Sequence, residues 1–576
     1  MKHEFDVLVI GSGAAGFSAA ISAHDSGLKV LMVEKAEVFG GTTAYSAGVV
    51  WVPCSDEARD AGISDTPERA LEYLRSESGG LLDDEKAKAF LANAPKTLRY
   101  LTQHTHVKFD LAPTWSDYHP TLPGGHAGGR SLSPQPFDGR KLGKWFGNLR
   151  WPLRSMMGFG GMSIGRSDVP HLYAMQRKLG SAVHMAGLIL RYGVDRIAGW
   201  PRGTRLVNGN ALIAMLALSA KERRIPIWLD SPLVELRSST QGEVIGAMIR
   251  HNGALVVVNA RFGIVLACGG QAASTQYQSA YEHVQKRHEH FTVVPPGNTG
   301  DAVRAASAVG ATVDTRARAP AAWTPVSLLP MSDGSIDRFP HFVDRGKPGF
   351  IAVDPRGKRF VNEARSYHDF VYAMIDTCKG LEQTEAYLLC DSKTLRRFGI
   401  GAVPPWPSSP KPYERTGYLL KADTLAELAA KMHLGAGPLE HTVLTFNRFV
   451  AAGKDDEFGR GSDVYQHFNG SSLYLHENAN PNLATICDAP FYAVRLVAGD
   501  IGSFIGLKVN GRAQVLDGKD EVIPGLYAAG NDITSIMGGT YPGAGITIGP
   551  ALTFGLLASI DIARRANLKP AFEELA

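Results

Sequence analysis

Short apolar runs, separated by glycine and small residues, shape the start of the chain. Residues 5–10 read FDVLVI, with four β-branched or aromatic residues in six, and predict a buried strand. Residues 11–16 read GSGAAG and predict a tight turn, and the alanine-rich segment after them predicts a helix that can pack close to a sheet. Residues 29–33 predict a second strand, so the pattern indicates a strand–turn–helix–strand unit.

Further strand patterns lie in the middle of the chain and end at a pair of prolines. Apolar runs predict strands at 225–229, 233–236, 244–250, 254–258 and 262–267. Pro295, Pro296 and the glycine after them predict a boundary. The NTGD stretch at 298–301 predicts the start of a helix.

The segment 140–200 has a different pattern. Residues 156–165 (MMGFGGMSIG) and 182–200 (AVHMAGLILRYGVDRIAGW) are apolar and contain several methionines. Three interpretations are open: a buried helix of an insertion, a lid over a lipophilic substrate, which methionine suits because it fills irregular gaps, or a weak contact with a membrane surface. No apolar run reaches 18 residues, so no membrane span is expected.

Composition narrows the function classes. A length of 576 residues predicts two to four domains. The 60 Lys and Arg nearly balance the 56 Asp and Glu, without a dense basic run, so a nucleic-acid partner is not expected. The five cysteines are scattered, with neither metal-binding nor haem spacing, and the N-terminus lacks the pattern of a signal peptide. We expect a reduced, cytoplasmic protein without a metal site.

The glycine turn carries the first chemistry. Gly11 makes the turn, Gly13 lets a pyrophosphate approach the backbone, and Gly16 lets helix meet strand. The helix N-terminus offers free N–H groups to phosphates. Glu34, 18 residues after Gly16, can accept hydrogen bonds from a ribose diol. This unit predicts a dinucleotide site.

Three further motifs identify the dinucleotide. They are GGTTAYSAG at 40–48, ARFGIVLACGG at 260–270 and PGLYAAGND at 524–532. The set resembles the flavoprotein family that includes succinate dehydrogenase and fumarate reductase. The resemblance implies FAD, with a C-terminal helix whose N-terminus faces the flavin ring and stabilises negative charge on it. The implied FAD-binding residues are Gly11, Gly13, Ala14, Ala15, Gly16, Glu34, Lys35, Gly41, Thr42, Thr43, Ser46, Ala47, Gly48, Ala267, Gly269, Gly270, Asp301, Gly530, Asn531, Gly545, Ile546 and Ile548.

The same resemblance implies an α/β fold. We expect a Rossmann-like FAD-binding domain over 1–296, with a parallel sheet, a small antiparallel sheet at about 225–270 and a helical insertion at about 110–200. A discontinuous α+β capping domain would follow over 297–499, and 500–576 would return to the FAD-binding domain.

The stretch GKRFVNEARSYHD at 357–369 separates subfamilies. Fumarate reductases have an arginine proton donor where this chain has Tyr367, and a tyrosine there favours a neutral substrate. A shifted alignment would instead bring in Arg365. Tyr367, together with YPGAG at 541–545, resembles 3-ketosteroid Δ1-dehydrogenases. Further matching pieces are SDYHPTLPGG at 116–125, FDGRKLG at 137–143, DTLAELA at 423–429 and NPNL at 480–483.

This second resemblance implies a catalytic set of Tyr118, Tyr367, Tyr541 and Gly545. The hydroxyl of Tyr541 and the N–H of Gly545 would hold the substrate carbonyl and stabilise its enolate. Tyr367 would take the α-proton, and because a phenol has a pKa of about 10, Tyr118 would have to lower that pKa or pass the proton on. Flavin N5 would accept the hydride from the β-carbon. Tyr118 as a turn residue, Tyr367 as a core aromatic and His368 with Asp369 as a catalytic pair are alternatives.

Departures from the family pattern surround the ring-binding pocket. Gly539 stands where the family has histidine, 319–325 reads APAAWTP without the family's acidic residue and paired tryptophans, and Trp115, Phe504 and Ile505 are expected to line the pocket. A 3-ketosteroid desaturated at Δ1 rather than Δ4 and a smaller cyclohexanone-type ketone therefore both remain open. A fumarate-reductase-like ene reductase and a non-catalytic flavin-binding protein are further alternatives. Without haem or iron–sulfur ligands, electrons would leave to a quinone, another flavoprotein or oxygen.

Overall fold

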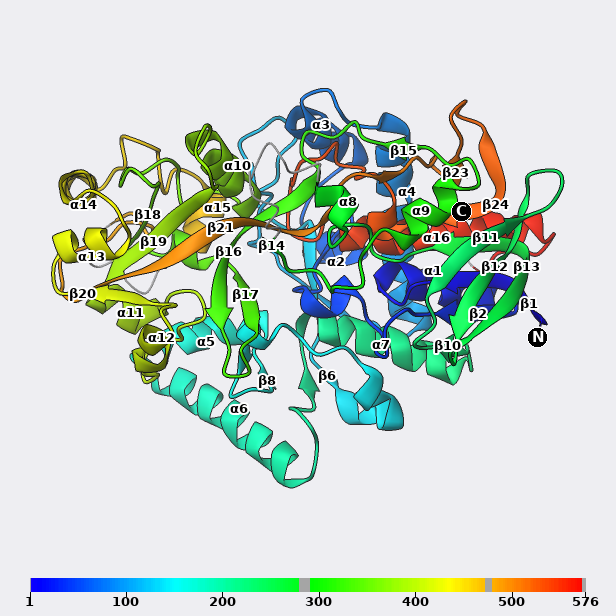
Figure 1. The fold of residues 1–576 in the computed structure, drawn as a ribbon, viewed down its shortest axis with the longest axis horizontal. Coiled ribbons are helices and arrows are strands. Elements are labelled where there is room, and N and C mark those ends of the chain that lie inside the picture. Colours follow the sequence, from blue (N-terminus) through cyan, green and yellow to red (C-terminus); the bar gives the residue numbers. More distant parts are fainter. Residues whose placement is uncertain (1, 279–290, 472–478, 572–576) are drawn as a thin grey trace.

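The N-terminal unit folds as predicted. The structure, a computed structural model, describes residues 2–278, 291–471 and 479–571. Strand β1 (Lys2–Ile10) leads through the glycine turn into helix α1 (Ala14–Asp25) and strand β2 (Val30–Val33), which pairs with β1 in parallel. Figure 1 shows this unit at one end of the long axis of the molecule, with a second sheet at the other end.

The first sheet has eight strands among the described residues. Its main path runs β10-β2-β1-β13-β12-β11, and β24 joins the far side of β13 in parallel, with β23 beside it. The further strands are β10 (Ile227–Trp228), β11 (Leu233–Ser238), β12 (Val244–His251), β13 (Ala254–Leu266), β23 (Gln514–Leu516) and β24 (Val522–Ala528).

Two details of the predicted antiparallel sheet were wrong. Strand β10 pairs with β2 in parallel, so 225–229 extends the main sheet. The runs 254–258 and 262–267 form one strand, β13, whose first residues pair with β12 antiparallel while the strand from Val257 onward pairs with β1 in parallel. The antiparallel strands β11 and β12 are therefore an extension of the main sheet, because the long strand β13 belongs to both the parallel and the antiparallel part.

Helices cover the first sheet closely because their contact residues are small. Helix α16 (Ile548–Arg565) packs on α1, and a Cβ added at Gly555 would lie 2.4 Å from the carbonyl oxygen of Ala15. Helix α7 (Asn208–Glu222) also packs on α1 and is buried along most of its length. Glycine and alanine at these positions therefore set the close approach of the helices.

The second sheet is mainly antiparallel. Over the described residues its main path runs β17-β16-β21-β19-β18, and β14 and β20 also pair with β21. Its strands are β14 (Phe291–Thr292), β16 (Ala321–Pro330), β17 (Ile336–Pro340), β18 (Phe350–Val353), β19 (Glu385–Asp391), β20 (Leu420–Ala422) and β21 (Phe491–Ser503). Helix α10 (Tyr367–Thr377) packs against β16.

Further helices and short strands complete the described fold. The remaining helices are α2 (Asp56–Asp60), α3 (Pro67–Ser78), α4 (Asp84–His104), α5 (Val169–Ala174), α6 (Leu179–Ile197), α8 (Thr275–Gln278), α9 (Asp301–Ser307), α11 (Ser392–Phe398), α12 (Lys411–Arg415), α13 (Leu425–Lys431), α14 (Ala436–Ala452) and α15 (Val464–Asn469). The remaining strands are β3 (Val50–Trp51), β4 (Phe109–Leu111), β5 (Ser131–Pro134), β6 (Phe137–Asp138), β7 (Met157–Gly158), β8 (Met162–Ser163), β9 (Arg205–Leu206), β15 (Val313–Asp314) and β22 (Gly506–Leu507).

The apolar helix of the insertion is not buried. In α6, Leu179, Leu190 and Ile197 are 82 %, 71 % and 90 % exposed, and Figure 1 shows the helix along an outer edge, away from both sheets. The interpretation of this segment as a buried helix was therefore wrong, because few of its apolar side chains reach the core. None of the helices in the described part of the chain combines the length and hydropathy needed to span a membrane.

Candidate active site

A cavity of about 1480 Å³ connects the glycine turn with the three tyrosines. Most of the residues predicted to bind the cofactor or substrate line it: Gly11, Gly13, Ala14, Ala15, Glu34, Lys35, Gly41, Thr42, Thr43, Ser46, Ala47, Gly48, Trp115, Tyr118, Ala267, Gly269, Gly270, Asp301, Tyr367, Gly530, Asn531, Tyr541, Gly545 and Ile548. Four lie outside the lining: Gly16, Phe504, Ile505 and Ile546.

The glycine turn fits a pyrophosphate. A Cβ at Gly11, which has φ +113°, would lie 2.0 Å from the carbonyl oxygen of Ala267, and one at Gly16 would lie 2.1 Å from that of Gly11. At Gly13 the nearest atom is the Thr43 hydroxyl at 3.7 Å, so space is open on the cavity side. The N-cap residue of α1, Gly13, has no capping side chain; the N–H of Ala14 donates to the Thr43 hydroxyl at 3.2 Å, and the positive end of the helix faces the space open at Gly13, which suits a phosphate.

Charged side chains lie at the end of the cavity where Glu34 is predicted to bind the ribose. The Glu34 carboxylate accepts hydrogen bonds from the backbone N–H of Ser12 at 3.2 Å and of Ala36 at 2.9 Å. The Lys35 ammonium lies 2.8 Å from an Asp301 oxygen and donates to Thr299 at 2.8 Å. These contacts hold the end of β2 against the start of α9, where an acidic group can meet a ribose diol.

Asp532 is a residue of this half of the site that sequence reasoning missed. Its buried carboxylate accepts hydrogen bonds from the backbone N–H of Gly270, at 2.9 Å, and of Cys268. Burial raises its pKa to about 6. The carboxylate thereby fixes the turn in which Gly269 and Gly270 both adopt positive φ, +90° and +82°. Its place directly after Gly530 and Asn531 was the available signal.

The loop that carries Tyr118 is fastened to the C-terminal glycine loop. The N–H of Tyr118 donates to the carbonyl of Pro542 at 2.9 Å, and the Tyr73 hydroxyl donates to the same carbonyl at 2.6 Å. The next residue, His119, lies with one ring nitrogen 2.6 Å from Asp369 and the other 2.9 Å from Glu77. Burial alone would lower the pKa of His119, but the two carboxylates raise it well above its usual value. A charged His119 therefore ties Tyr118 to the start of α10.

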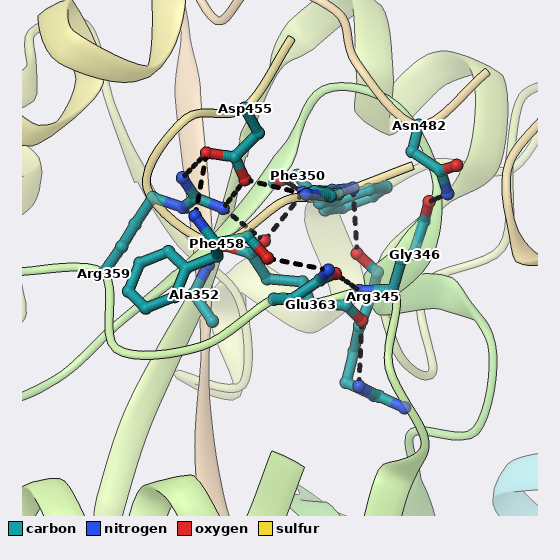
Figure 2. A network of polar contacts seen from close by, with 12 residues as sticks. Arg345, Gly346, Phe350, Ala352, Arg359, Glu363, Asp455, Phe458 and Asn482 are labelled. Carbon is teal, nitrogen blue, oxygen red and sulfur yellow. Dashed lines mark hydrogen bonds and ion pairs between the residues drawn. The ribbon is translucent and has the colours of Figure 1, made fainter. Parts of the chain in front are cut away.

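Tyr367 begins α10 and follows a buried ion network (Figure 2). The Ser366 hydroxyl caps the helix by accepting from the N–H of Asp369 at 3.1 Å. Glu363 is fully buried and accepts from Arg359 at 2.8 and 2.9 Å and from Arg460 at 3.1 Å. Such a paired network is costly to disturb, so it fixes the residues before Tyr367. The conspicuous RFVNE pattern of the sequence thus has a positioning role.

The three phenols meet at one end of the cavity. The hydroxyls of Tyr118 and Tyr367 are 3.3 Å apart, and the ring centroid of Tyr541 lies 5.7 Å from that of Tyr118 and 5.1 Å from that of Tyr367. Each side chain is at most 6 % exposed. Burial raises the pKa of all three phenols. Burial, together with the hydrogen bond to Tyr118, acts to raise the pKa of Tyr367, and the roles expected of Tyr118 and Tyr367 stay predictions.

The loop from Tyr541 to Gly545 has no space for side chains on its inner side. Gly545 has φ +98°, and a Cβ there would lie 2.5 Å from the backbone nitrogen of Trp51. Among the described residues no acceptor bonds the N–H of Gly545, which lines the cavity. Helix α16 begins at Ile548 with no capping side chain and no acid in its first turn, so its N-terminus adds partial positive charge here.

The residues predicted for the substrate pocket, and those considered as catalytic alternatives, differ in whether they reach the cavity. Trp115 lines the cavity, whereas Phe504 lies outside the lining with its ring 6.3 Å from that of Tyr541. Arg365 is exposed, so the cavity holds Tyr367 and not this arginine. His368 and Asp369 do not form a pair, because Asp369 contacts His119 while His368 accepts from the N–H of Trp323. Cavity residues that sequence reasoning missed include Arg166, Lys347 and Tyr465.

The fold and the glycine cradle define an FAD-dependent flavoprotein. The chain belongs to the FAD binding domain family, which it matches over residues 6–548. It is 38 % identical, over 98 % of its length and 94 % of the relative, to a 4-oxocyclohex-2-ene-1-carboxylate 5-dehydrogenase of Sinomonas cyclohexanicum. It is 36 % identical, over 98 % of both chains, to a 3-oxosteroid 1-dehydrogenase of Mycolicibacterium smegmatis.

A solved structure shows the same fold. The 3-ketosteroid Δ1-dehydrogenase from Sterolibacterium denitrificans, in complex with 1,4-androstadiene-3,17-dione, matches with a TM-score of 0.90 and 34 % identity over 98 % of this chain and all of that one. Together with the family, this match confirms the α/β fold and FAD as the cofactor.

Proposed function

We propose that the protein desaturates a cyclic ketone, removing hydrogen from the carbon atoms α and β to the carbonyl. The observation that carries the proposal is the meeting of three buried phenols at the cavity end beyond the glycine cradle, in a cavity that Gly545 also lines. The relatives named for oxosteroids and for an oxocyclohexene carboxylate support it, since both kinds of substrate contain a ring ketone with neighbouring C–H bonds.

Tyr541 and Gly545 would bind the carbonyl oxygen. The phenol and the backbone N–H are both donors, and together they stabilise the negative charge that develops on the oxygen as the α-proton leaves. The glycine loop places these donors in a buried, low-dielectric site, where such hydrogen bonds are stronger than in water.

Tyr367 and Tyr118 would carry the proton. Because burial keeps Tyr367 neutral at rest, it can accept the α-proton only by passing its own proton on. The Tyr118 hydroxyl at 3.3 Å is placed to receive that proton while releasing its own proton to solvent. The positive charge of Arg166 favours negative charge on Tyr118. Bound FAD, held by the glycine turn and by α16, supplies the acceptor for the hydride from the β-carbon.

A substrate panel with an artificial electron acceptor tests this function. Cyclohexanone-type ketones and androstenedione should lose two hydrogens and form a conjugated enone, detected by mass and absorbance. Failure of every saturated ketone, with reduction of an unsaturated acid instead, would favour the ene-reductase alternative. A flavin that neither ketone nor acid reduces or oxidises would favour a binding protein.

The natural electron acceptor is proposed to be external. Quinone, another flavoprotein and oxygen remain the candidates, and rates of reoxidation of the reduced protein by each would separate them. A cytoplasmic location stays a prediction from the cysteine pattern.

A further inference from the structure

A cation lies beside the tyrosines at the substrate end of the cavity. Arg166 is half-buried and lines the cavity. Its guanidinium carbon lies 3.0 Å from the ring centroid of Trp115 and 5.3 Å from that of Phe468. Trp115 precedes Tyr118 by three residues and Phe468 follows Tyr465, whose ring packs on Tyr118. Arg166 thus belongs to the phenol end and not to the glycine cradle.

This arginine has no carboxylate partner among residues 2–278, 291–471 and 479–571. One terminal N–H group donates to the Ser133 hydroxyl at 3.3 Å, and no described acceptor bonds the others. Burial lowers the pKa of Arg166 to about 9, as expected of a desolvated cation without a counter-charge. The aromatic faces hold the plane of the guanidinium and leave its edge, which carries the N–H donors, for a planar acceptor.

A second cation lines the same cavity. Lys347 is 8 % exposed, and burial lowers its pKa to about 8. Its ammonium donates to the carbonyl of Gly470 at 2.8 Å and lies 5.5 Å from the centre of the Tyr173 ring. The carboxylate whose charge acts on Lys347, that of Asp344, is bonded to His341 at 2.6 Å. The ammonium has three N–H donors and only one bonded acceptor, so it can also donate a hydrogen bond to an anion.

We propose that Arg166, with Lys347 as a second cation, binds a carboxylate carried by the ketone substrate. The protein would then be selective for anionic cyclic ketones, such as a ring keto acid or a steroid with an acidic side chain. This inference rests on the proposed desaturation. It revises the expectation of a neutral substrate, which came from Tyr367 replacing the arginine of fumarate reductases, since the cavity supplies a cation from a different segment.

The test compares acids with their methyl esters on the holoenzyme. One arm uses 4-oxocyclohexanecarboxylate and its ester, and the other a 3-oxosteroid with a side-chain carboxylate and its ester. We expect kcat/KM to favour the acid in at least one arm, which also identifies the size of the substrate. In Arg166→Gln the preference for the acid over the ester should fall by about 10- to 100-fold, the range for a hydrogen bond to a charged group, beyond any loss of turnover that both substrates share through Tyr118. Arg166→Lys should restore part of the preference.

A control and a binding measurement complete the test. Arg154→Gln removes an exposed arginine paired with Asp333 and should leave the preference unchanged. Calorimetric titration with cyclohexanecarboxylate, which has no ketone to oxidise, should show about tenfold weaker binding to Arg166→Gln. Equal turnover of acid and ester by the wild type, or an equal loss on both in Arg166→Gln, would overturn the anion site while leaving desaturation intact. Failure of every ketone would instead reject the proposed function.

Discussion

Replacing Tyr541 by phenylalanine removes one proposed donor to the carbonyl while keeping the ring. Loss of a single oxyanion donor costs about 10²–10³ in kcat, or roughly 3–4 kcal/mol of transition-state stabilisation. The fold should lose far less. Tyr541 is 4 % exposed and its ring packs on Tyr118 and Tyr367, contacts that phenylalanine keeps. Only the hydroxyl's hydrogen bonds are lost, at about 1 kcal/mol of unfolding free energy.

The assay measures ketone desaturation with saturating artificial acceptor, alongside thermal unfolding of the holoenzyme. Tyr527→Phe is a matched control, because that buried phenol donates to Asp561 at 2.8 Å and lies outside the cavity lining. It should lose similar stability and keep its turnover. If Tyr541→Phe retained kcat within about threefold of the wild type, the hydroxyl could not be stabilising the enolate, and the argument from the glycine loop would be refuted.

Three further predictions concern the cofactor, the fold and the proton route. Gly11→Ala should purify with little FAD, because its Cβ would lie 2.0 Å from the Ala267 carbonyl oxygen; a normal ratio of flavin to protein would contradict this. Burial raises the pKa of Asp532 from 3.8 to about 6, so protonation of Asp532 stabilises the folded protein fully below about pH 4. This contribution, about 3 kcal/mol of unfolding free energy, is lost as the pH rises through 6. Asp532→Asn should therefore flatten the measured pH dependence of the unfolding free energy by that amount. Tyr118→Phe should slow turnover by about 10²–10⁴ and increase the isotope effect of an α-deuterated ketone, whereas an unchanged isotope effect would remove Tyr118 from the proton route.

Local motifs predicted the cofactor half of the protein because all the residues that each turn requires are neighbours in the sequence. Gly11 and Gly16 can be read from the sequence, since the turn excludes every side chain there. The strand β10 could not be assigned to its sheet, because its pairing with β2 depends on the crossover through α7 and not on its own residues. The exposed helix α6 was wrongly predicted to be buried, because the hydrophobicity of a segment alone does not determine whether other elements pack against it.

The substrate half depends on contacts between distant segments. Tyr118 and Tyr367 were predicted from short motifs, but their 3.3 Å approach results from the His119 contacts and the Glu363 network. Arg166 has no distinguishing neighbour in sequence, and its proposed role follows only from packing on Trp115, 51 positions earlier in the sequence. Sequence reasoning therefore found residues whose neighbours form a motif and missed those defined by tertiary packing.

The central claim is that these phenols remove an α-proton from a ketone so that hydride can reach the bound flavin. Anaerobic rapid mixing of the holoenzyme with a saturated cyclic ketone tests it most directly. The account predicts loss of the oxidised-flavin absorbance with one enone formed per flavin, and bleaching about 10²–10⁴ slower in Tyr367→Phe. A flavin that stays oxidised with the wild type, or bleaches equally fast in Tyr367→Phe, would contradict it.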